Sequence, residues 1–279
     1  MNVIIGIDVG GSTTKIVGYY EDGTLIGRAQ VEAADPQTSA YGALGKFVNE
    51  NNLSLKQVKQ IVLTGVGSPL FKKDIYGIPA CKVDEFQAIG LGGLALSKKK
   101  EAFVISMGTG TAFVRADKNG IRHIGGSGVG GGTVLGLCGA LCNARSFDTV
   151  VELAHKGDLR KVDLNIADIS ASAISSLTGE VTASNFGKMA DGLQPEDLAR
   201  GVLNMVFQTI GMLAVFACRN DHIKDVVVTG TLSRVPCAAQ LFKQVEHLYK
   251  IKFTIPRYSI YATATGAALL YIYKNRKRK

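Results

Sequence analysis

The sequence predicts an α/β protein built from two similar lobes. Short apolar runs that suit buried strands alternate with longer stretches of helical periodicity. Two of these runs, 3–7 and 103–107, each lead into a turn rich in glycine and threonine, then a second run and an Asx-Gly turn. Because the two layouts begin about a hundred positions apart, we predict an internal duplication.

The first half reads as strand, loop, strand, turn and strand before its helices begin. Strands are predicted at 3–7, 15–19, 24–29, 58–63 and 79–83, with a hairpin turn at Asp22-Gly23. One helix is predicted over 39–51, because Leu44 and Phe47 share a face with Val48. A second helix runs from a cap at Asp84 to about residue 97.

The second half repeats this plan and then continues with more helices. Strands are predicted at 103–107, 112–115, 121–124, 226–228 and 253–255. Helices are predicted at 133–144, 147–155, 196–219, 236–248 and 262–273, and a glycine-rich run at 125–132 precedes the first of them. We therefore expect an N-terminal lobe over residues 1–97 and a C-terminal lobe over residues 98–279.

Composition excludes several classes of protein. A chain of 279 residues with 46% hydrophobic content suits a globular fold rather than a disordered one. Part of the net charge of +9 lies in the tail 274–279, where no aromatic residue offers a stacking surface, so we expect no nucleic-acid partner. The sequence contains no run of about 20 apolar residues, so we predict no membrane span. Five cysteines without zinc spacing, and a first apolar run too short for a signal peptide, predict a cytoplasmic protein.

The first loop has the residue types that bind phosphate. Glycines let the backbone approach a polyphosphate, hydroxyls donate to its oxygens and a lysine adds positive charge. These residues are Gly10, Gly11, Ser12, Thr13, Thr14 and Lys15. Asp8, at the end of a buried strand, is placed to hold Mg²⁺ through water. The spacing is neither a Walker A loop nor G-x-G-x-x-G, and a plain hairpin turn is the alternative.

Two later loops extend this pattern. Gly108-Thr109-Gly110-Thr111 follows the apolar run of the second layout, and Thr229-Gly230-Thr231-Leu232-Ser233 follows a late strand. We expect the first two loops, from facing lobes, to clamp a triphosphate. The third suits an adenosine, because glycine lets a flat ring approach the backbone. Together the loops predict an ATP cleft between the lobes.

The three loops resemble the phosphate and adenosine elements of the superfamily of acetate and sugar kinases, heat-shock chaperones and actin. The finer pattern is similar to that of type II pantothenate kinases, the eukaryotic-like form. It covers nearly the whole chain, and its specific parts are the glycine run 125–132 and the run 177–187, Leu-Thr-Gly-Glu-Val-Thr-Ala-Ser-Asn-Phe-Gly. The resemblance implies a duplicated actin-like ATPase fold, related to ribonuclease H, with two lobes around the ATP cleft.

The resemblance also implies an activity and a set of roles. The activity is ATP- and Mg²⁺-dependent phosphorylation of pantothenate to 4'-phosphopantothenate, the first step of coenzyme A biosynthesis, by a homodimer. Glu85 would be the catalytic carboxylate, although from the residues alone Asp84 and Glu85 also read as helix caps. The implied ATP contacts are Asp8 to Lys15, Thr109, Gly131, Gly132, Thr133, Val134, Leu135, Phe147 and Thr231. The implied substrate contacts are Glu85, Thr109, Arg122, His123, Thr182 and Ala183, the last two in a region that lies near the partner's substrate site.

The sequence departs from the family pattern at the acceptor end. His123 stands where relatives usually carry an arginine, with Arg122 beside it, and Ala112 stands where a serine is frequent. A neutral imidazole does not replace a bidentate guanidinium. The acceptor is therefore less well defined than ATP, and kinases of another small hydroxyl metabolite stay open.

Other functions stay open as well. Activators of 2-hydroxyacyl-CoA dehydratases begin with a similar loop, but hold an iron–sulfur cluster with cysteines. Sugar kinases with a structural zinc carry a Cys-x-Cys-Gly cluster, which this sequence lacks. A metabolite sensor that binds ATP without transferring phosphate is the remaining alternative.

Overall fold

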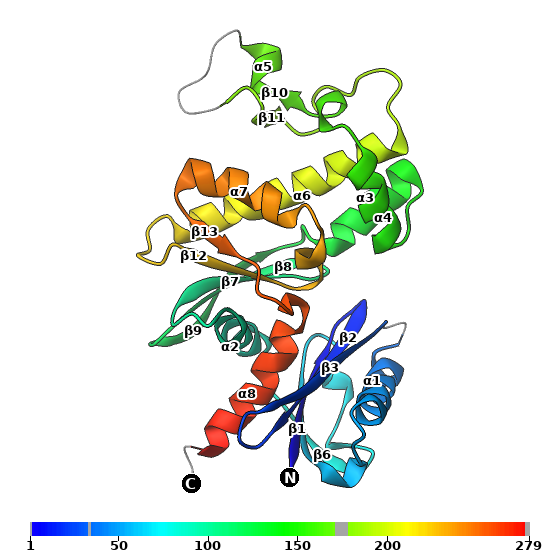
Figure 1. The fold of residues 1–279 in the computed structure, drawn as a ribbon, viewed down its shortest axis with the longest axis vertical. Helices are drawn as coiled ribbons and strands as arrows, with labels where there is room; N and C mark the ends of the chain where they lie inside the picture. Colours follow the sequence, from blue (N-terminus) through cyan, green and yellow to red (C-terminus); the bar gives the residue numbers. More distant parts are fainter. Residues whose placement is uncertain (1, 33–34, 171–177, 277–279) are drawn as a thin grey trace.

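The computed structural model describes residues 2–32, 35–170 and 178–276, and shows two lobes, each built on a mixed sheet (Figure 1). Residues 277–279 of the basic tail and Leu177 of the run quoted above lie outside this range. The two lobes confirm the predicted α/β architecture.

The first sheet has the strand order β3-β2-β1-β4-β6-β5. Its strands are β1 (Val3–Val9), β2 (Thr13–Tyr20), β3 (Leu25–Glu32), β4 (Val58–Thr64), β5 (Asp74–Ile75) and β6 (Ile78–Lys82). Strands β1, β2 and β3 pair antiparallel, whereas β4 pairs parallel with both β1 and β6.

The second sheet repeats this connectivity. Its order is β13-β12-β7-β8-β9, with β7 (Ala102–Met107), β8 (Thr111–Asp117), β9 (Gly120–Ser127), β12 (Asp225–Thr229) and β13 (Lys252–Thr254). Strands β7, β8 and β9 pair antiparallel, and β12 pairs parallel with β7 and β13. Each lobe therefore contains an antiparallel meander followed by two parallel strands, which is the duplication that the sequence predicts.

Helices cover both sheets. They are α1 (Pro36–Glu50), α2 (Glu85–Ser97), α3 (Gly131–Cys142), α4 (Phe147–Lys156), α5 (Ile166–Ile169), α6 (Pro195–Cys218), α7 (Ala238–Tyr249) and α8 (Ala262–Arg276). Helix α1 begins earlier than the predicted residue 39, because Asp35 caps it and Pro36 fits its first turn. Two short 3-10 helices, η4 (Thr231–Arg234) and η5 (Ser259–Tyr261), lie at the junction of the lobes.

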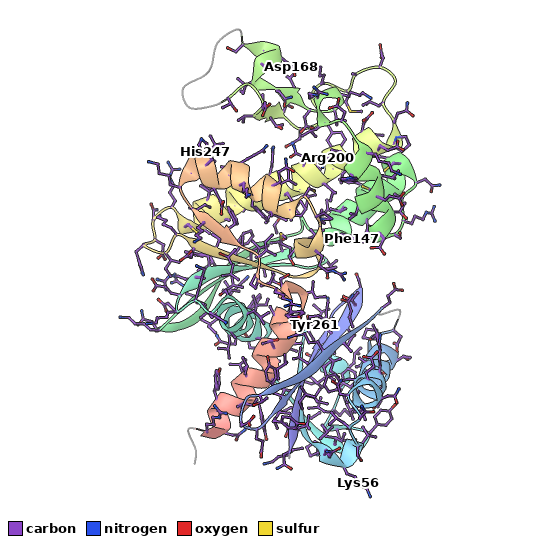
Figure 2. All side chains as sticks on the ribbon, viewed as in Figure 1. Lys56, Phe147, Asp168, Arg200, His247 and Tyr261 are labelled. Carbon is purple, nitrogen blue, oxygen red and sulfur yellow. The ribbon has the colours of Figure 1, made fainter. Side chains whose placement is uncertain are left out.

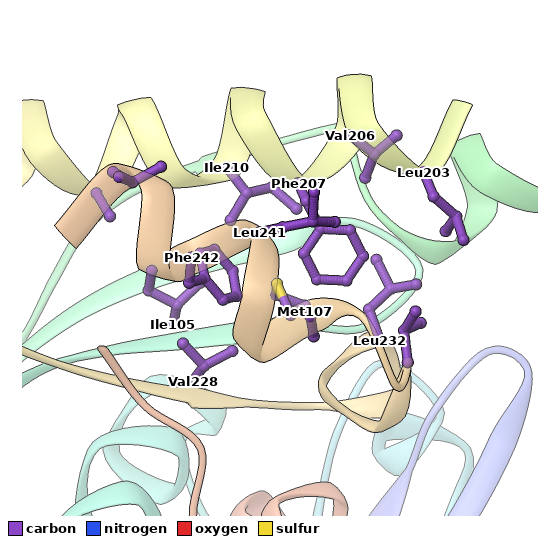
Figure 3. Close-up of a cluster of buried hydrophobic side chains, with 14 of the residues drawn as sticks. Ile105, Met107, Leu203, Val206, Phe207, Ile210, Val228, Leu232, Leu241 and Phe242 are labelled. Atoms are coloured by element: carbon purple, nitrogen blue, oxygen red, sulfur yellow. The ribbon is translucent and has the colours of Figure 1, made fainter. Parts of the chain in front are cut away.

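The largest core lies between the second sheet and helices α6 and α7 (Figure 3). Phe207 of α6 meets Phe242 of α7 edge to face at 5.5 Å, above Ile105 and Val228 of the sheet. Helix α6 is long and apolar enough to cross a membrane, but 61% of its most apolar stretch is buried inside the fold. Its apolar character is thus explained by packing in the core.

Helices α2 and α8 each pack against the sheet of the other half of the chain. Ile89 of α2 lies with Val104 and Val227 of the second sheet, whereas Ala268 of α8 lies with Ile4 of the first. The two helices cross between the lobes (Figure 1). The predicted division at residue 97 did not anticipate that each of these helices would pack on the other lobe's sheet.

The crossing of α2 and α8 depends on glycine. A Cβ added to Gly266 would lie 1.9 Å from the carbonyl oxygen of Ala88, and one added to Gly92 would lie 1.8 Å from that of Ala262. Backbone therefore touches backbone, and the lobes meet through a contact that no larger residue permits.

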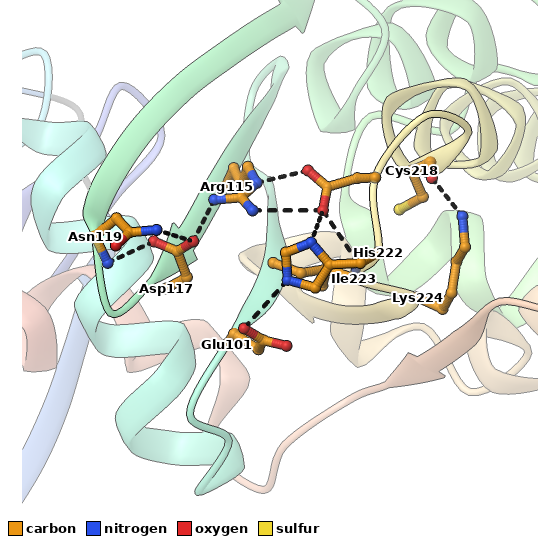
Figure 4. Close-up of polar contacts among 9 residues, drawn as sticks. Glu101, Arg115, Asp117, Asn119, Cys218, His222, Ile223 and Lys224 are labelled. Atoms are coloured by element: carbon orange, nitrogen blue, oxygen red, sulfur yellow. Dashed lines mark hydrogen bonds and ion pairs between the residues drawn. The ribbon is translucent and has the colours of Figure 1, made fainter.

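A charged cluster fastens the outer part of the second lobe (Figure 4). Arg115 of β8 donates from Nε to Asp221 at 2.6 Å and also pairs with Asp117. The Arg115 guanidinium is the main reason that the pKa of Asp221 falls to about 2. His222 reaches Glu101, which precedes β7. This cluster ties the strands together and uses none of the predicted site residues.

Short elements were not predicted from the sequence. They include the pair β10 (Leu164–Asn165) and β11 (Thr182–Ser184), which lies beyond α6 from the second sheet (Figure 1). Strands of two or three residues show no clear alternation of apolar and polar residues, so periodicity does not reveal them.

Candidate active site

The first loop joins β1 to β2 and places Asp8 directly opposite Lys15 in the sheet. Burial raises the pKa of Asp8, and the positive charge of Lys15 opposes the shift. Burial also lowers the pKa of Lys15, which is 7% exposed, while Asp8 opposes that shift. Gly65 closes over this pair, because a Cβ there would lie 2.6 Å from the Asp8 carboxylate.

The predicted phosphate-binding hydroxyls of the first loop are not equivalent. Gly11 and Ser12 are exposed at the turn, beside Gly10, and Thr13 is partly exposed. Thr14 is fully buried, and its Oγ1 bonds Ser39 of α1 at 2.7 Å. The hydroxyl of Thr14 therefore anchors the loop to α1 instead of facing the cleft.

The second loop is held by the glycine run. Gly131 and Gly132, at the start of α3, donate their backbone N–H groups to the carbonyls of Gly108 at 2.8 Å and Thr109 at 2.9 Å. The hydroxyl of Thr133 accepts from the N–H of Gly130. The run is thus neither a flexible connector nor a free row of amides, since two of its N–H groups shape the second loop.

The three predicted loops converge. A Cβ on Gly11 would lie only 3.7 Å from Oγ1 of Thr109, so the first and second loops face each other across the cleft. Lys15 Nζ donates to Oγ1 of Thr231 at 3.3 Å, which links the first loop to the third. Gly230 has a φ of +85°, and a Cβ there would lie 2.5 Å from the Met107 carbonyl oxygen.

Glu85 is the first residue of α2 and lies near enough to Asp8 of the first loop for the two carboxylates to interact. The cap is made by Asp84, whose carboxylate accepts the N–H of Gln87 at 2.9 Å, so Glu85 is not needed for capping. Burial raises the pKa of Glu85, and the negative charges of Asp8 and Asp84 raise it further. The positive end of the helix dipole favours the ionised form of Glu85, but burial and the neighbouring carboxylates outweigh it.

Strand β9 brings His123 to the start of α2. Its imidazole stacks on the ring of Phe86, which follows Glu85, with centroids 3.8 Å apart and planes inclined by 14°. Gln87 Nε2 donates to the Ile121 carbonyl at 2.9 Å and fastens the strand to the helix. Arg122 is exposed beside it. The structure therefore places His123 against the first turn of α2, beside Phe86.

Other predicted ATP contacts lie on the second lobe. Val134 is fully buried in the core, so its side chain does not reach the cleft, and Leu135 and Phe147 pack partly buried against the same core. Phe147 lies on the side of the second lobe that faces the first (Figure 2).

Thr182 and Ala183 lie apart from the cleft. They belong to β11, on the far side of α6 (Figure 1). Thr182 donates to Asp163, a fully buried carboxylate that also accepts from Asn204 Nδ2 at 2.7 Å and from the N–H of Phe186 at 2.9 Å. Much of the run around Asn185 therefore serves to hold the buried carboxylate of Asp163. The sequence alone did not reveal this role of Asp163.

Comparisons with known proteins identify relatives of this chain. A family model described as Fumble matches residues 102–269. Type II pantothenate kinase of Bacillus cereus strain G9842 is 28% identical over 241 residues, which is 83% of this chain and 84% of that protein. Type II pantothenate kinase of Staphylococcus aureus strain USA300 is 27% identical over 282 residues, 97% of this chain and 99% of that protein. Pantothenate kinase 1 of Arabidopsis thaliana is 28% identical over 286 residues, 82% of this chain and 74% of that protein.

Solved structures share the fold. The activator of the 2-hydroxyisocaproyl-CoA dehydratase from Clostridium difficile, with bound ADPNP, superposes with a TM-score of 0.70 at 17% identity, covering 99% of this chain and 98% of that one. Component A of the (R)-2-hydroxyglutaryl-CoA dehydratase of Acidaminococcus fermentans gives a TM-score of 0.70 at 16% identity, covering 99% and 100%. These similarities confirm the predicted two-lobed, actin-like ATPase fold.

Proposed function

The chain belongs to the Fumble family, and from this we propose that it transfers the γ-phosphoryl group of ATP to the primary hydroxyl of pantothenate. The product would be 4'-phosphopantothenate, at the start of coenzyme A biosynthesis. One observation carries the proposal. The first two loops face each other, Lys15 of the first loop lies beside them, and the carboxylate of Glu85, whose pKa is raised, lies near Asp8 of the first loop.

Phosphoryl transfer requires the two substrates to be held in position and the charge of the phosphates to be neutralised. In our proposal the backbone of the facing loops at Gly11 and Thr109 holds the β- and γ-phosphates, and the Lys15 ammonium attracts the charge that develops on them. Thr231 and the second lobe receive the adenosine. The acceptor oxygen forms a bond to the γ-phosphorus as the bond to the ADP oxygen breaks.

Glu85 receives the proton of the acceptor hydroxyl. A general base works best when its pKa lies near the working pH, and burial moves Glu85 in that direction. We propose that His123, on the strand beside the start of α2, receives the carboxylate of the acceptor. Arg122 precedes it on β9, where successive side chains point to opposite faces, so its guanidinium would have to reach the acceptor from the other face of the strand. Thr109 lies between the phosphates and this end of the site.

The residues at the first loop suit Mg²⁺. A magnesium ion neutralises phosphate charge, and it binds one or two carboxylates and several waters rather than a full protein cage. Asp8 is such a carboxylate, and the neighbouring Thr64 hydroxyl is buried with no hydrogen-bond partner in the described part of the chain. We propose that Asp8 holds the ion through water.

Thr182 and Ala183 would act in a homodimer. Because both lie beyond α6 from their own cleft, we propose that they reach the substrate site of a second copy. Helix α6 carries an apolar stripe suited to such contact, with Phe216 57% exposed and Met212 partly exposed on one face. Free cysteines throughout the described residues suit the reducing cytoplasm.

The experiment is a turnover assay with purified protein, ATP, Mg²⁺ and pantothenate, with phosphopantothenate measured directly. Glu85→Gln should lower kcat by at least about 100-fold, because the proton acceptor is lost. Glu152→Gln is the control, since Glu152 is exposed on α4 and, among the residues that the structure describes, forms an ion pair only with Lys156. Equal activity of Glu85→Gln and wild type, or iron in anaerobically purified protein without turnover of pantothenate, would contradict the proposal.

A further inference from the structure

An open groove of about 350 Å³ lies between the lobes and is lined by none of the predicted phosphate residues. One bank is formed by β3 and α1 of the first lobe, and the other by η4 and η5 at the junction. Its charged and polar lining residues are Arg28, Gln30, Glu32, Lys46, Glu50, Arg234 and Tyr261, and we call it the junction pocket. Tyr261 lies between the two lobes (Figure 2).

Arg28 is fixed at this pocket. Its guanidinium carbon lies 3.4 Å from the centre of the Tyr258 ring, so one flat face is covered while the N–H edges stay free to donate. The side chain is partly buried, and it forms no ion pair with a carboxylate in residues 2–32, 35–170 and 178–276. A partly buried guanidinium without a counter-ion is costly, which suggests that a ligand supplies the negative charge.

Arg234 lines the opposite bank. It is exposed to solvent, and it forms no ion pair with a carboxylate among the described residues. The phenol of Tyr261 lines the same pocket as the two arginines. Burial raises the pKa of Tyr261, the positive charges of Arg234 and Arg28 oppose that rise, and the negative charge of Glu50 adds to it. Two guanidiniums from opposite lobes and one hydroxyl donor thus face the same space.

The acidic residues of the pocket do not cancel this charge. Glu50 lies 3.9 Å from the ammonium of Lys46 and serves as its partner. Glu32 is the remaining carboxylate, against Arg28 and Arg234. The lining therefore has an excess of one positive charge, with Arg28 and Lys46 on one bank and Arg234 on the other.

We propose that the junction pocket binds a small phosphate-bearing molecule whose oxygens bridge Arg28 and Arg234. Guanidiniums match the oxygens of a phosphate in pairs, and the volume suits a small metabolite. This site goes beyond the kinase reaction, because none of the predicted ATP or substrate contacts lines it, although Arg234 follows Thr231 of the third loop in η4.

The position of the pocket couples it to the cleft. Gln30, in its wall, pairs with Lys15 in the sheet, and Arg234 lies in the same 3-10 helix as Thr231. A ligand that bridges the banks holds the lobes at one spacing. Thermodynamic linkage makes this coupling reciprocal. If the ligand changes the affinity of the protein for nucleotide by some factor, nucleotide changes its affinity for the ligand by the same factor.

The test is calorimetric titration of the full chain with inorganic phosphate, without nucleotide and with saturating ADPNP and Mg²⁺. Phosphate should bind in both series, and Arg28→Gln and Arg234→Gln should each weaken binding in the second series at least tenfold. Arg160→Gln is the matched control, because Arg160 is exposed and pairs with Asp158 elsewhere. Melting curves show whether each variant is folded.

Two results would overturn the inference. If ADPNP abolishes phosphate binding, the anion occupies the nucleotide site instead. If both Arg28→Gln and Arg234→Gln bind phosphate as wild type does, the pocket is not the site. Neither result depends on pantothenate, so failure here is distinct from failure of the proposed kinase activity.

Discussion

Replacing Gly266 with alanine tests the contact between α2 and α8. The added Cβ would lie 1.9 Å from the Ala88 carbonyl oxygen and 2.8 Å from the Gly92 nitrogen, both backbone atoms of α2. Since neither atom belongs to a flexible side chain, the helices must separate by roughly 1 Å. Overpacking of this kind costs about 1–3 kcal/mol, and more where the backbone has to move.

The expected loss is therefore about 3 kcal/mol of the free energy of unfolding, reduced by the roughly 0.5–1 kcal/mol that alanine gains over glycine within a helix. Gly42 supplies a matched control. It lies in the interior of α1, and a Cβ there would have no neighbour within 4 Å. Gly42→Ala should stabilise the protein by up to about 1 kcal/mol, so the same chemical change has opposite signs at the two sites.

Urea unfolding gives the free energy of unfolding of each variant and of wild type, and the values are compared where the slope m against urea concentration is the same. Activity gives a second readout, because Glu85 begins α2 and Asp8 lies on β1, the strand that α8 covers. A shift of about 1 Å between them should lower kcat at least tenfold in Gly266→Ala. A Gly266→Ala variant as stable as wild type, or as stable as Gly42→Ala, would refute the close backbone contact.

Further predictions concern buried carboxylates. Because the pKa of Glu85 is raised in the folded state, its ionised form opposes folding at neutral pH. Glu85→Gln should thus unfold at a higher temperature than wild type at pH 7, and the advantage should vanish by about pH 4, where the unfolded chain also binds the proton; a constant difference across this range would contradict the assignment. Asp163→Ala removes the acceptor of Asn204 and should cost about 3–4 kcal/mol. The exposed control Asp191→Ala should change stability by less than about 0.5 kcal/mol in the same urea series.

Local patterns in the sequence predict much of this fold. The apolar runs before Asp8 and Gly108 became β1 and β7, and the Asx-Gly turns became the hairpins that follow them. The same patterns locate the two glycine- and threonine-rich loops that follow these strands, because glycine and threonine requirements are local to a turn. Both kinds of prediction rest on residues close together in the chain.

Long-range packing is what the sequence could not show. Nothing in the periodicity of α8 indicates that it covers the first sheet, and Asp163 reads as an ordinary surface aspartate until Asn204 is placed beside it. The environment of Glu85 is equally non-local, because the carboxylate of Asp8 reaches it from another strand. Arg28 and Arg234 come to line one pocket only after both lobes have formed.

The exchange of α2 and α8 has a consequence for synthesis of the chain. On the ribosome, β1, β2 and β4 emerge early, yet Ile4, Val17 and Val62 are covered by α8, which is translated last of the helices described. The first lobe therefore cannot bury this face while the second is being made. The nascent chain keeps an apolar sheet surface exposed for most of its translation, which makes it a substrate for chaperones that bind exposed apolar segments.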